Sequence, residues 1–420
     1  MHYVIVGNSY AGIAALEAIR EIDKEGRVAL ISDEEHHVYS RPLISYYLAG
    51  KVTSDKMFYR PENFYKKNKV ETLFGKTVTK VYPEEKKIQL NDQSVITFDK
   101  LLVATGGKPF VPLIKGLSAK NIFTFTKYDD AKVLGKIVKK GTKVVIVGGG
   151  LIGLKAAEGL NALEAEVSIV ELGPRVLALA LDEISGEMLN SRLTNKGIRI
   201  ITKHTVSEIL SNEQGEVSGV ILDDKRELGC EVLVVAIGVR PNMDLLKDTS
   251  INVNRGILVN EYMQTSDRDI FAAGDVVETY DMINEKNNVI AIVPLAFDQG
   301  RIAGFNMATG LKRKYLGGLS MNSVEVYGLP IMTMGLTNST DDSQKVLSYE
   351  KDGIYRKLVF LGDNLVGVIL VGDVAKGGML THIIKSKKNV SSYKDRLING
   401  EFSDIFIDTQ NEIVKACNNL

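Results

Sequence analysis

Two glycine-rich segments carry the residues whose spacing predicts chemistry. The later segment is VIVGGGLIG, in which Gly148, Gly150 and Gly153 follow an apolar strand in a G-x-G-x-x-G pattern. In this pattern the first glycine allows a sharp turn, the second lets a phosphate approach the backbone, and the third lets a helix pack on the strand. Because N–H groups at a helix start carry partial positive charge, such a turn binds phosphate. The segment therefore predicts a dinucleotide-binding site.

The earlier segment, VIVGNSYAG, follows the same pattern with one substitution. Gly7 and Gly12 stand at the first and third positions, and Ser9 replaces the second glycine. Serine is small enough for a phosphate to approach, and its hydroxyl can donate a hydrogen bond. Either turn alone has the alternative interpretation of an accidental glycine match, because such motifs discriminate loosely. Two turns, each followed by a strand that ends in an acid, favour two nucleotide sites.

The acids at those strand ends predict contacts to ribose. Asp33 follows the strand VALIS, and Glu171 ends the strand EVSIVE. A carboxylate at this position accepts hydrogen bonds from the ribose hydroxyls of an adenosine and repels a 2′-phosphate. The second site is therefore expected to prefer NADH over NADPH, moderately so because Arg175 is near in sequence. The alternative for either acid is an ordinary solvated loop carboxylate.

The elements that position these residues are repeated along the chain. Each copy reads strand, turn, helix, strand, which predicts two doubly wound α/β domains. Two further apolar strands end in glycines, in KLLVATGGKP and VLVVAIGVRPN, and DIFAAGDV places Asp275 directly after Gly274. Beyond about residue 310, RKLVFLGDNLVGVILVGD predicts an antiparallel hairpin with its turn at 362–364, and a helix is expected at 379–386.

Composition bounds the class of protein. The 420 residues are 45% hydrophobic and 25% charged, which suits a globular chain of two or three domains. Lys plus Arg and Asp plus Glu both number 52, so no basic excess favours nucleic acid or an anionic membrane. No apolar run is long enough to span a membrane, and a strand begins too early for a signal segment. Cys230 and Cys417 suit neither a disulfide framework nor a metal site. A cytoplasmic location is expected.

With these motifs in hand, the chain resembles the pyridine nucleotide–disulphide oxidoreductase family of FAD proteins. The resemblance rests on both turns, on ATG at 104–106 and on AAGD at 272–275. The segment YSRPLISYYLAGK is similar to rubredoxin reductases, to the flavin half of assimilatory nitrite reductases, and to the FAD–NAD oxidoreductases that accompany carbon monoxide dehydrogenase. The resemblance implies an FAD-binding domain at 1–113 and 249–314, an inserted NAD(H) domain at 114–248, and a small α+β interface domain at 315–420.

The resemblance also implies which residues bind each nucleotide. Those assigned to FAD are Gly7, Ser9, Tyr10, Ala11, Gly12, Asp33, Arg41, Pro42, Ala104, Thr105, Gly106, Gly274, Asp275, Pro294 and Leu295. Those assigned to NAD are Gly148, Gly150, Leu151, Ile152, Gly153, Glu171 and Gly238. Pro42 is expected to flank the isoalloxazine, and Asp275 is expected to accept a ribityl hydroxyl or face the pyrophosphate. A helix N-cap is the alternative role for Asp275.

Two departures from the family pattern shape the expected chemistry. Disulphide reductases of the family carry a reactive cysteine near positions occupied here by Pro42 and Leu43, so thiol chemistry is excluded. Cys230 lies in an apolar strand, where a packed structural thiol is expected. Lys155 stands where many relatives have a glutamate close to flavin N5, and its alternative is a solvent-facing lysine.

The resulting expectation is an FAD enzyme that exchanges a hydride with NAD(H) and single electrons with a rubredoxin or ferredoxin-like iron–sulphur carrier. NADP(H) is less favoured, no metal site is predicted, and a homodimer stays open. The alternatives are an NADH oxidase, the flavin subunit of a larger carbon monoxide dehydrogenase or nitrite reductase system, or a non-enzymatic flavoprotein. The basic run KSKKNVSSYKDR either steers an acidic carrier or forms an ordinary solvated face.

Overall fold

The computed structural model describes residues 1–338 and 341–401, which divide into two compact units. The first unit contains residues Met1–Pro174 and Gly197–Gly318, and the second contains Arg175–Lys196 together with the described residues after Gly318. The first unit holds both glycine-rich turns. The segment Arg175–Lys196, expected within the inserted domain at 114–248, groups with the C-terminal residues. The finer division into three domains stays a prediction.

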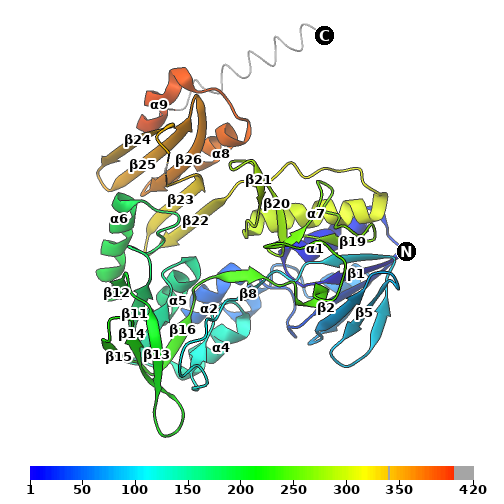
Figure 1. Ribbon diagram of the computed structural model, residues 1–420, viewed down its shortest axis with the longest axis horizontal. Helices are drawn as coiled ribbons and strands as arrows, with labels where there is room; N and C mark the ends of the chain where they lie inside the picture. Colours follow the sequence, from blue (N-terminus) through cyan, green and yellow to red (C-terminus); the bar gives the residue numbers. More distant parts are fainter. Residues whose placement is uncertain (339–340, 402–420) are drawn as a thin grey trace. The chain divides into compact units, whose positions relative to one another are not determined.

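The first unit contains two five-stranded parallel sheets, one for each turn (Figure 1). The first sheet has the order β19 (Ile270–Ala272), β7 (Lys100–Val103), β1 (His2–Val6), β2 (Arg27–Ser32) and β3 (Val70–Phe74). The second has the order β12 (Arg199–Thr202), β11 (Glu166–Glu171), β10 (Lys143–Val147), β16 (Val232–Val235) and β9 (Ile122–Phe123). In both, the strand that precedes the turn is central. The predicted fold class, with two nucleotide-binding α/β sheets and a C-terminal α+β part, is confirmed.

Helices α1 (Tyr10–Ile22) and α7 (Val293–Thr309) lie side by side in the first unit (Figure 1). On α1 the apolar residues Ile13, Leu16 and Ile19 are all fully buried, as their helical spacing predicts. The close approach of the two helices depends on glycine. A Cβ at Gly300 would lie 2.2 Å from the Ala11 carbonyl oxygen, and one at Gly304 would lie 2.2 Å from that of Ala15.

Short strands and helices complete the first unit. Three three-stranded sheets are formed by β4 (Val78–Tyr82), β5 (Lys87–Leu90) and β6 (Val95–Thr97), by β13 (Val206–Ser211), β14 (Val217–Leu222) and β15 (Glu227–Gly229), and by β18 (Ile257–Leu258), β20 (Val277–Asp281) and β21 (Lys286–Asn288). Strand β8 (Gly107–Pro109) pairs with β17 (Val239–Pro241). The remaining helices are η1 (Arg41–Leu43), α2 (Ile44–Leu48), η2 (Ser54–Met57), α3 (Phe64–Lys67), α4 (Tyr128–Ile137), α5 (Leu151–Asn161) and η3 (Asp244–Leu246).

The second unit is built on one antiparallel sheet. Its strands are β22 (Met321–Val326), β23 (Leu329–Gly335), β26 (Asn364–Val371), β25 (Ile354–Leu361) and β24 (Gln344–Lys351), in that order. The predicted hairpin is β25–β26, in which Leu361 pairs with Asn364. The unit also contains α6 (Glu183–Thr194), α8 (Gly377–Lys385), η4 (Ser391–Tyr393) and α9 (Lys394–Asn399). The helix expected at 379–386 is therefore present as α8.

Candidate functional site

The second glycine turn has the geometry of a phosphate cradle. Gly148 adopts a φ of +108°, and a Cβ at Gly153 would lie 2.0 Å from the Gly148 carbonyl oxygen, so neither position accepts a side chain. Gly150 is the N-cap of α5, and no heavy atom lies within 4 Å of where its Cβ would be. The backbone at Gly150, directly before Leu151 and Ile152, is therefore open to the close approach of a phosphate.

Glu171 closes this turn from the end of β11. Its carboxylate accepts hydrogen bonds from the N–H of Gly149 at 2.5 Å and from that of Gly173 at 2.6 Å. Gly238 has a φ of +117° and lies two residues beyond Ala236, whose carbonyl oxygen would lie 2.4 Å from a Cβ on Gly148. The structure thus brings the residues predicted to bind NAD to the carboxyl ends of β10, β11 and β16.

The first glycine turn has the same construction. Gly7 adopts a φ of +125° with the Ala104 carbonyl oxygen 2.1 Å from a Cβ position, and a Cβ at Gly12 would lie 1.9 Å from the Gly7 oxygen. Ser9 is the N-cap of α1, and its side chain makes no capping hydrogen bond. Tyr10 stacks on Tyr59 with ring centroids 5.0 Å apart. The substitution of serine for glycine leaves the turn intact.

Other predicted FAD residues gather around this turn. Gly274 lies against α1, since a Cβ there would be 3.1 Å from the Ala11 Cβ, and its N–H donates to the Gln299 side chain at 2.9 Å. Thr105 donates its hydroxyl to the Asn242 carbonyl at 2.7 Å. Gly106 has a φ of +65°. Pro294 and the buried Leu295 lie in the first turn of α7.

The surroundings of Asp275 show whether these residues fit a ligand that donates hydrogen bonds. Its side chain is partly buried, and none of the described residues donates a hydrogen bond to its carboxylate. Burial raises the pKa of the Asp275 carboxyl, and the Arg41 guanidinium partly offsets that rise. A carboxylate left in this state is costly unless a ligand hydroxyl or N–H satisfies it. The site therefore fits the ribityl or ribose part of a flavin nucleotide.

The acids after β2 do not occupy the position that Glu171 occupies at the end of β11. Gly7 N–H donates to the Ile31 carbonyl and Gly148 N–H to that of Val170, so Ser32, one residue before Asp33, is the counterpart of Glu171. Asp33 is half exposed and forms an ion pair with Lys127 at 2.7 Å. Its contact to ribose stays a prediction.

Glu34 is the carboxylate of this loop that the sequence analysis missed. It is only 6% exposed and accepts hydrogen bonds from the Tyr39 hydroxyl at 2.6 Å and from Arg41 at 2.5 Å. Arg41 also donates to the Thr126 carbonyl at 2.9 Å, and Pro42 follows it, exposed, in η1. The signal for it in the sequence is the Y-x-R segment that begins five residues later, because a buried carboxylate requires such partners.

Lys155 is held between elements of the two nucleotide-binding segments. Its ammonium lies 4.7 Å from the centre of the Tyr46 ring on α2 and pairs with Glu158 on its own helix. The side chains of Lys155 and Glu158 are only 20% and 11% exposed. The solvent-facing alternative therefore does not describe this lysine. Nearby, α2 approaches α5 so closely that a Cβ at Gly159 would lie 2.9 Å from the Leu48 side chain.

Cys230 is a packed core residue. It is 1% exposed, and burial, with a smaller contribution from Glu231, raises the pKa of its thiol to about 12. A thiol with such a pKa provides almost no thiolate at neutral pH. Cys417 lies outside the described residues.

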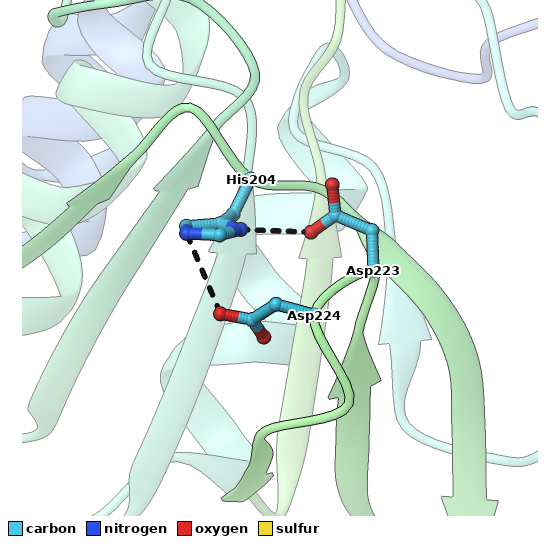
Figure 2. A group of neighbouring side chains, drawn as sticks. All are labelled: His204, Asp223 and Asp224. Atoms are coloured by element: carbon cyan, nitrogen blue, oxygen red, sulfur yellow. Dashed lines mark hydrogen bonds and ion pairs between the residues drawn. The ribbon is translucent and has the colours of Figure 1, made fainter.

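One cluster in the described residues has the composition of a metal site (Figure 2). His204 Nδ1 lies 2.9 Å from Asp223, whereas its Nε2 lies 3.5 Å from Asp224. The two carboxylates therefore face different ring nitrogens, and Arg226 already pairs with Asp224 at 2.5 Å. This arrangement is that of a histidine flanked by two acids on the surface.

Comparisons with known proteins agree with this geometry. Residues 1–300 match the family model described as pyridine nucleotide-disulphide oxidoreductase, and residues 321–388 match that of the rubredoxin NAD+ reductase C-terminal domain. The chain is 30% identical over 390 residues to the NAD(P)H nitrite reductase of Bacillus subtilis, covering 92% of this chain and 48% of that protein. The chain thus spans about half the length of that relative.

Two further relatives match over more of their own length. The NADH oxidase of Methanocaldococcus jannaschii is 31% identical over 346 residues, which cover 80% of this chain and 76% of that protein. The crystal structure of NADH:rubredoxin oxidoreductase from Clostridium acetobutylicum is similar with a TM-score of 0.76 and 28% identity, covering 95% of this chain and 99% of that one.

Within the described residues, no helix combines the length and the apolar character needed to cross a bilayer. The family match extends over residues 1–300 and contains both glycine turns, which confirms the resemblance expected from the sequence. The chain belongs to the pyridine nucleotide-disulphide oxidoreductase family.

Proposed function

We propose that this chain is an FAD-dependent NAD(P)H oxidoreductase that passes electrons between NADH and a small iron or iron–sulphur carrier of the rubredoxin or ferredoxin type. The observation that carries the proposal is the pair of glycine turns on parallel sheets, one accompanied by Asp275, to which no described residue donates a hydrogen bond, and the other by Glu171. Similarity to an NADH:rubredoxin oxidoreductase over nearly all of both chains supports the choice of carrier.

In this proposal the first turn holds the FAD pyrophosphate. The backbone around Ser9 and the start of α1 supplies N–H donors, and Arg41 balances phosphate charge while Glu34 and Thr126 orient its guanidinium. Asp275 accepts a hydroxyl of the flavin nucleotide, and Asp33 accepts the adenosine ribose. Bound FAD would supply the chemistry that joins two-electron exchange with nicotinamide to one-electron exchange with the carrier.

The second turn holds NAD(H). Its N–H groups bind the pyrophosphate. The Glu171 carboxylate accepts hydrogen bonds from ribose hydroxyls in place of those from backbone N–H groups. Glu171 would repel a 2′-phosphate. Arg175, the cation near it in the sequence, already donates from its Nε to the Leu181 carbonyl at 3.0 Å. We therefore propose NADH as the preferred donor. No acid–base residue is required, and the protonated Cys230 takes no part.

Lys155 is proposed to tune the transfer step. Fixed by Tyr46 and Glu158 between α2 and α5, its positive charge would raise the affinity of the site for electrons. The variant Lys155→Glu is expected to lower the flavin reduction potential or slow reduction by NADH. No change in either quantity would remove Lys155 from the mechanism.

Two alternatives have specific support. Similarity to the Methanocaldococcus jannaschii NADH oxidase favours oxygen as acceptor, and similarity to part of a nitrite reductase favours a role as the flavin component of a larger system. Turnover with oxygen, measured against turnover with rubredoxin or ferredoxin, separates the first alternative. Co-purification with a larger assembly would identify the second.

The test is an anaerobic titration of the purified chain with NADH, followed by oxidised carrier, while the flavin absorbance is recorded. We expect bleaching by NADH and recovery by the carrier. Bound FAD that NADH does not bleach would overturn the oxidoreductase proposal, and bleaching that only oxygen reverses would overturn the carrier.

A further inference from the structure

One segment links the NAD(H) turn to the second unit. Glu171 and Pro174 belong to the first unit, but Arg175–Lys196, which contains α6, belongs to the second. The chain therefore leaves the carboxylate that faces the turn and, four residues later, enters a segment whose packing is provided by the C-terminal sheet. Val176 and Leu181 of that segment are both fully buried.

Asp182, at the N-cap of α6, is the central anchor of the segment. One of its oxygens accepts from the Ser185 N–H at 3.1 Å and hydroxyl at 2.6 Å. The other accepts from the Tyr355 hydroxyl at 2.5 Å and lies 3.2 Å from the Lys357 ammonium. Tyr355 is 2% exposed and Lys357 is 8% exposed. The capping box with Ser185 accounts for the hydrogen bonds of one Asp182 oxygen. The ion pair of the other oxygen with a buried lysine on β25 is not something that a helix cap requires.

The loop before Asp182 is held at two further points. The Asn338 side chain donates to the Ala178 carbonyl at 3.0 Å and to that of Leu179 at 3.3 Å. Arg175 donates to the Leu181 carbonyl and lies so close to α6 that a Cβ at Gly186 would be 2.5 Å from its Cδ. The loop 175–182 is thus a closed, internally bonded structure fixed to β25.

We propose that Asp182, Tyr355 and Lys357 position the short connection after Glu171 for NAD(H) binding, so that the anchor on the C-terminal sheet contributes to dinucleotide affinity through the chain itself. This inference rests on the proposed function. Glu171 is followed by only Leu172, Gly173 and Pro174 before the anchored loop begins. Loosening the anchor would increase the motion of that short connection, and binding would then have to order it.

The test uses the full FAD-loaded chain and measures the NADH dissociation constant, kcat and FAD content. Tyr355→Phe removes one hydrogen bond with little change in volume, and Lys357→Met removes the buried charge, with Lys357→Arg as its conservative partner. The matched control is Lys345→Met, at an exposed position on the neighbouring strand β24. Amide exchange of the peptide 171–182 reports on the loop directly.

We expect Tyr355→Phe to weaken NADH binding about threefold or more, a typical effect of one buried hydrogen bond. Exchange of the peptide 171–182 should increase, while kcat, FAD content and the control stay unchanged. Lys357→Arg should bind NADH more tightly than Lys357→Met. Faster exchange with unchanged NADH affinity would overturn this inference alone. A wild-type chain that binds FAD but no NADH would overturn the proposed function and this inference with it.

Discussion

At the scale of single residues, Asp275 combines a cost to folding with a role in binding. Burial raises the pKa of its carboxyl above the ordinary value of 3.8. The stability that this group contributes is therefore fully present below pH 3.8 and is lost as the pH rises through the folded-state pKa. At neutral pH, an ionised Asp275 without a ligand destabilises the apoprotein.

We expect Asp275→Asn to stabilise the apoprotein at pH 7, because the amide removes a charge that partial burial disfavours. The same change should weaken FAD binding about tenfold or more, since a charged acceptor is lost. Thermal melts of the apoprotein and flavin titrations measure the two effects. The stability difference should shrink toward pH 3.8, and a difference independent of pH would contradict this account of Asp275.

Glu171 is the residue expected to set dinucleotide choice. Replacing it with glutamine keeps an acceptor for ribose but removes the charge that repels a 2′-phosphate. We expect Glu171→Gln to reduce the preference for NADH over NADPH about tenfold, a change of about 1.4 kcal/mol, as measured by kcat/KM for each donor. Asp33→Asn is the matched control at the other turn and should leave that preference unchanged at saturating FAD.

The glycines of both turns could be predicted from the sequence because their roles follow from local sterics. The inward-facing acid after β2 could not, because Asp33, Glu34 and Glu35 are consecutive. Which of them points inward depends on strand register and on Tyr39 and Arg41, and a shift of one residue reverses the side.

At the scale of elements, two glycines at the start of α5 have different roles, one in helix packing and the other in the approach of a ligand. Gly153→Ala would place a methyl group 2.0 Å from the Gly148 oxygen, whereas Gly150→Ala would meet no atom within 4 Å. We expect the first variant to lose about 3 kcal/mol or more of stability, and the second to fold normally but bind NADH poorly. Denaturant unfolding and NADH titration distinguish them. Normal NADH binding by Gly150→Ala would show that the pyrophosphate lies elsewhere.

The pairing of α1 with α7 was not predictable from local pattern. The strand, turn, helix, strand pattern predicts α1, but it does not indicate the partner of that helix. The contact of the two helices depends on Gly300 and Gly304 meeting the backbone at Ala11 and Ala15, each 289 residues earlier in the sequence. Small residues inside a helix are compatible with many partners, so such a contact becomes visible only in the folded structure.

At the scale of the whole molecule, the net charge of zero means that any electrostatic attraction of a carrier depends on local charge. The predicted basic run begins at the end of α8, and its Lys394 pairs with Asp363 at 3.2 Å. If the run steers an acidic carrier, the rate of carrier reduction should fall about tenfold between about 50 and 500 mM salt. Stopped-flow measurements with NADH-reduced protein test this, and a rate independent of salt would leave the run as an ordinary solvated face.

The grouping of Arg175–Lys196 with the C-terminal sheet has a consequence for how this gene can be shortened. A stop codon after residue 318 would remove the sheet but leave α6 behind, without the hydrogen bond and ion pair that Tyr355 and Lys357 make with Asp182 at its N-cap. The reverse fragment, beginning at 319, would lack a helix that its fold requires. Fragments of this chain are therefore expected to keep this packing only when Arg175–Lys196 and the C-terminal sheet are retained together.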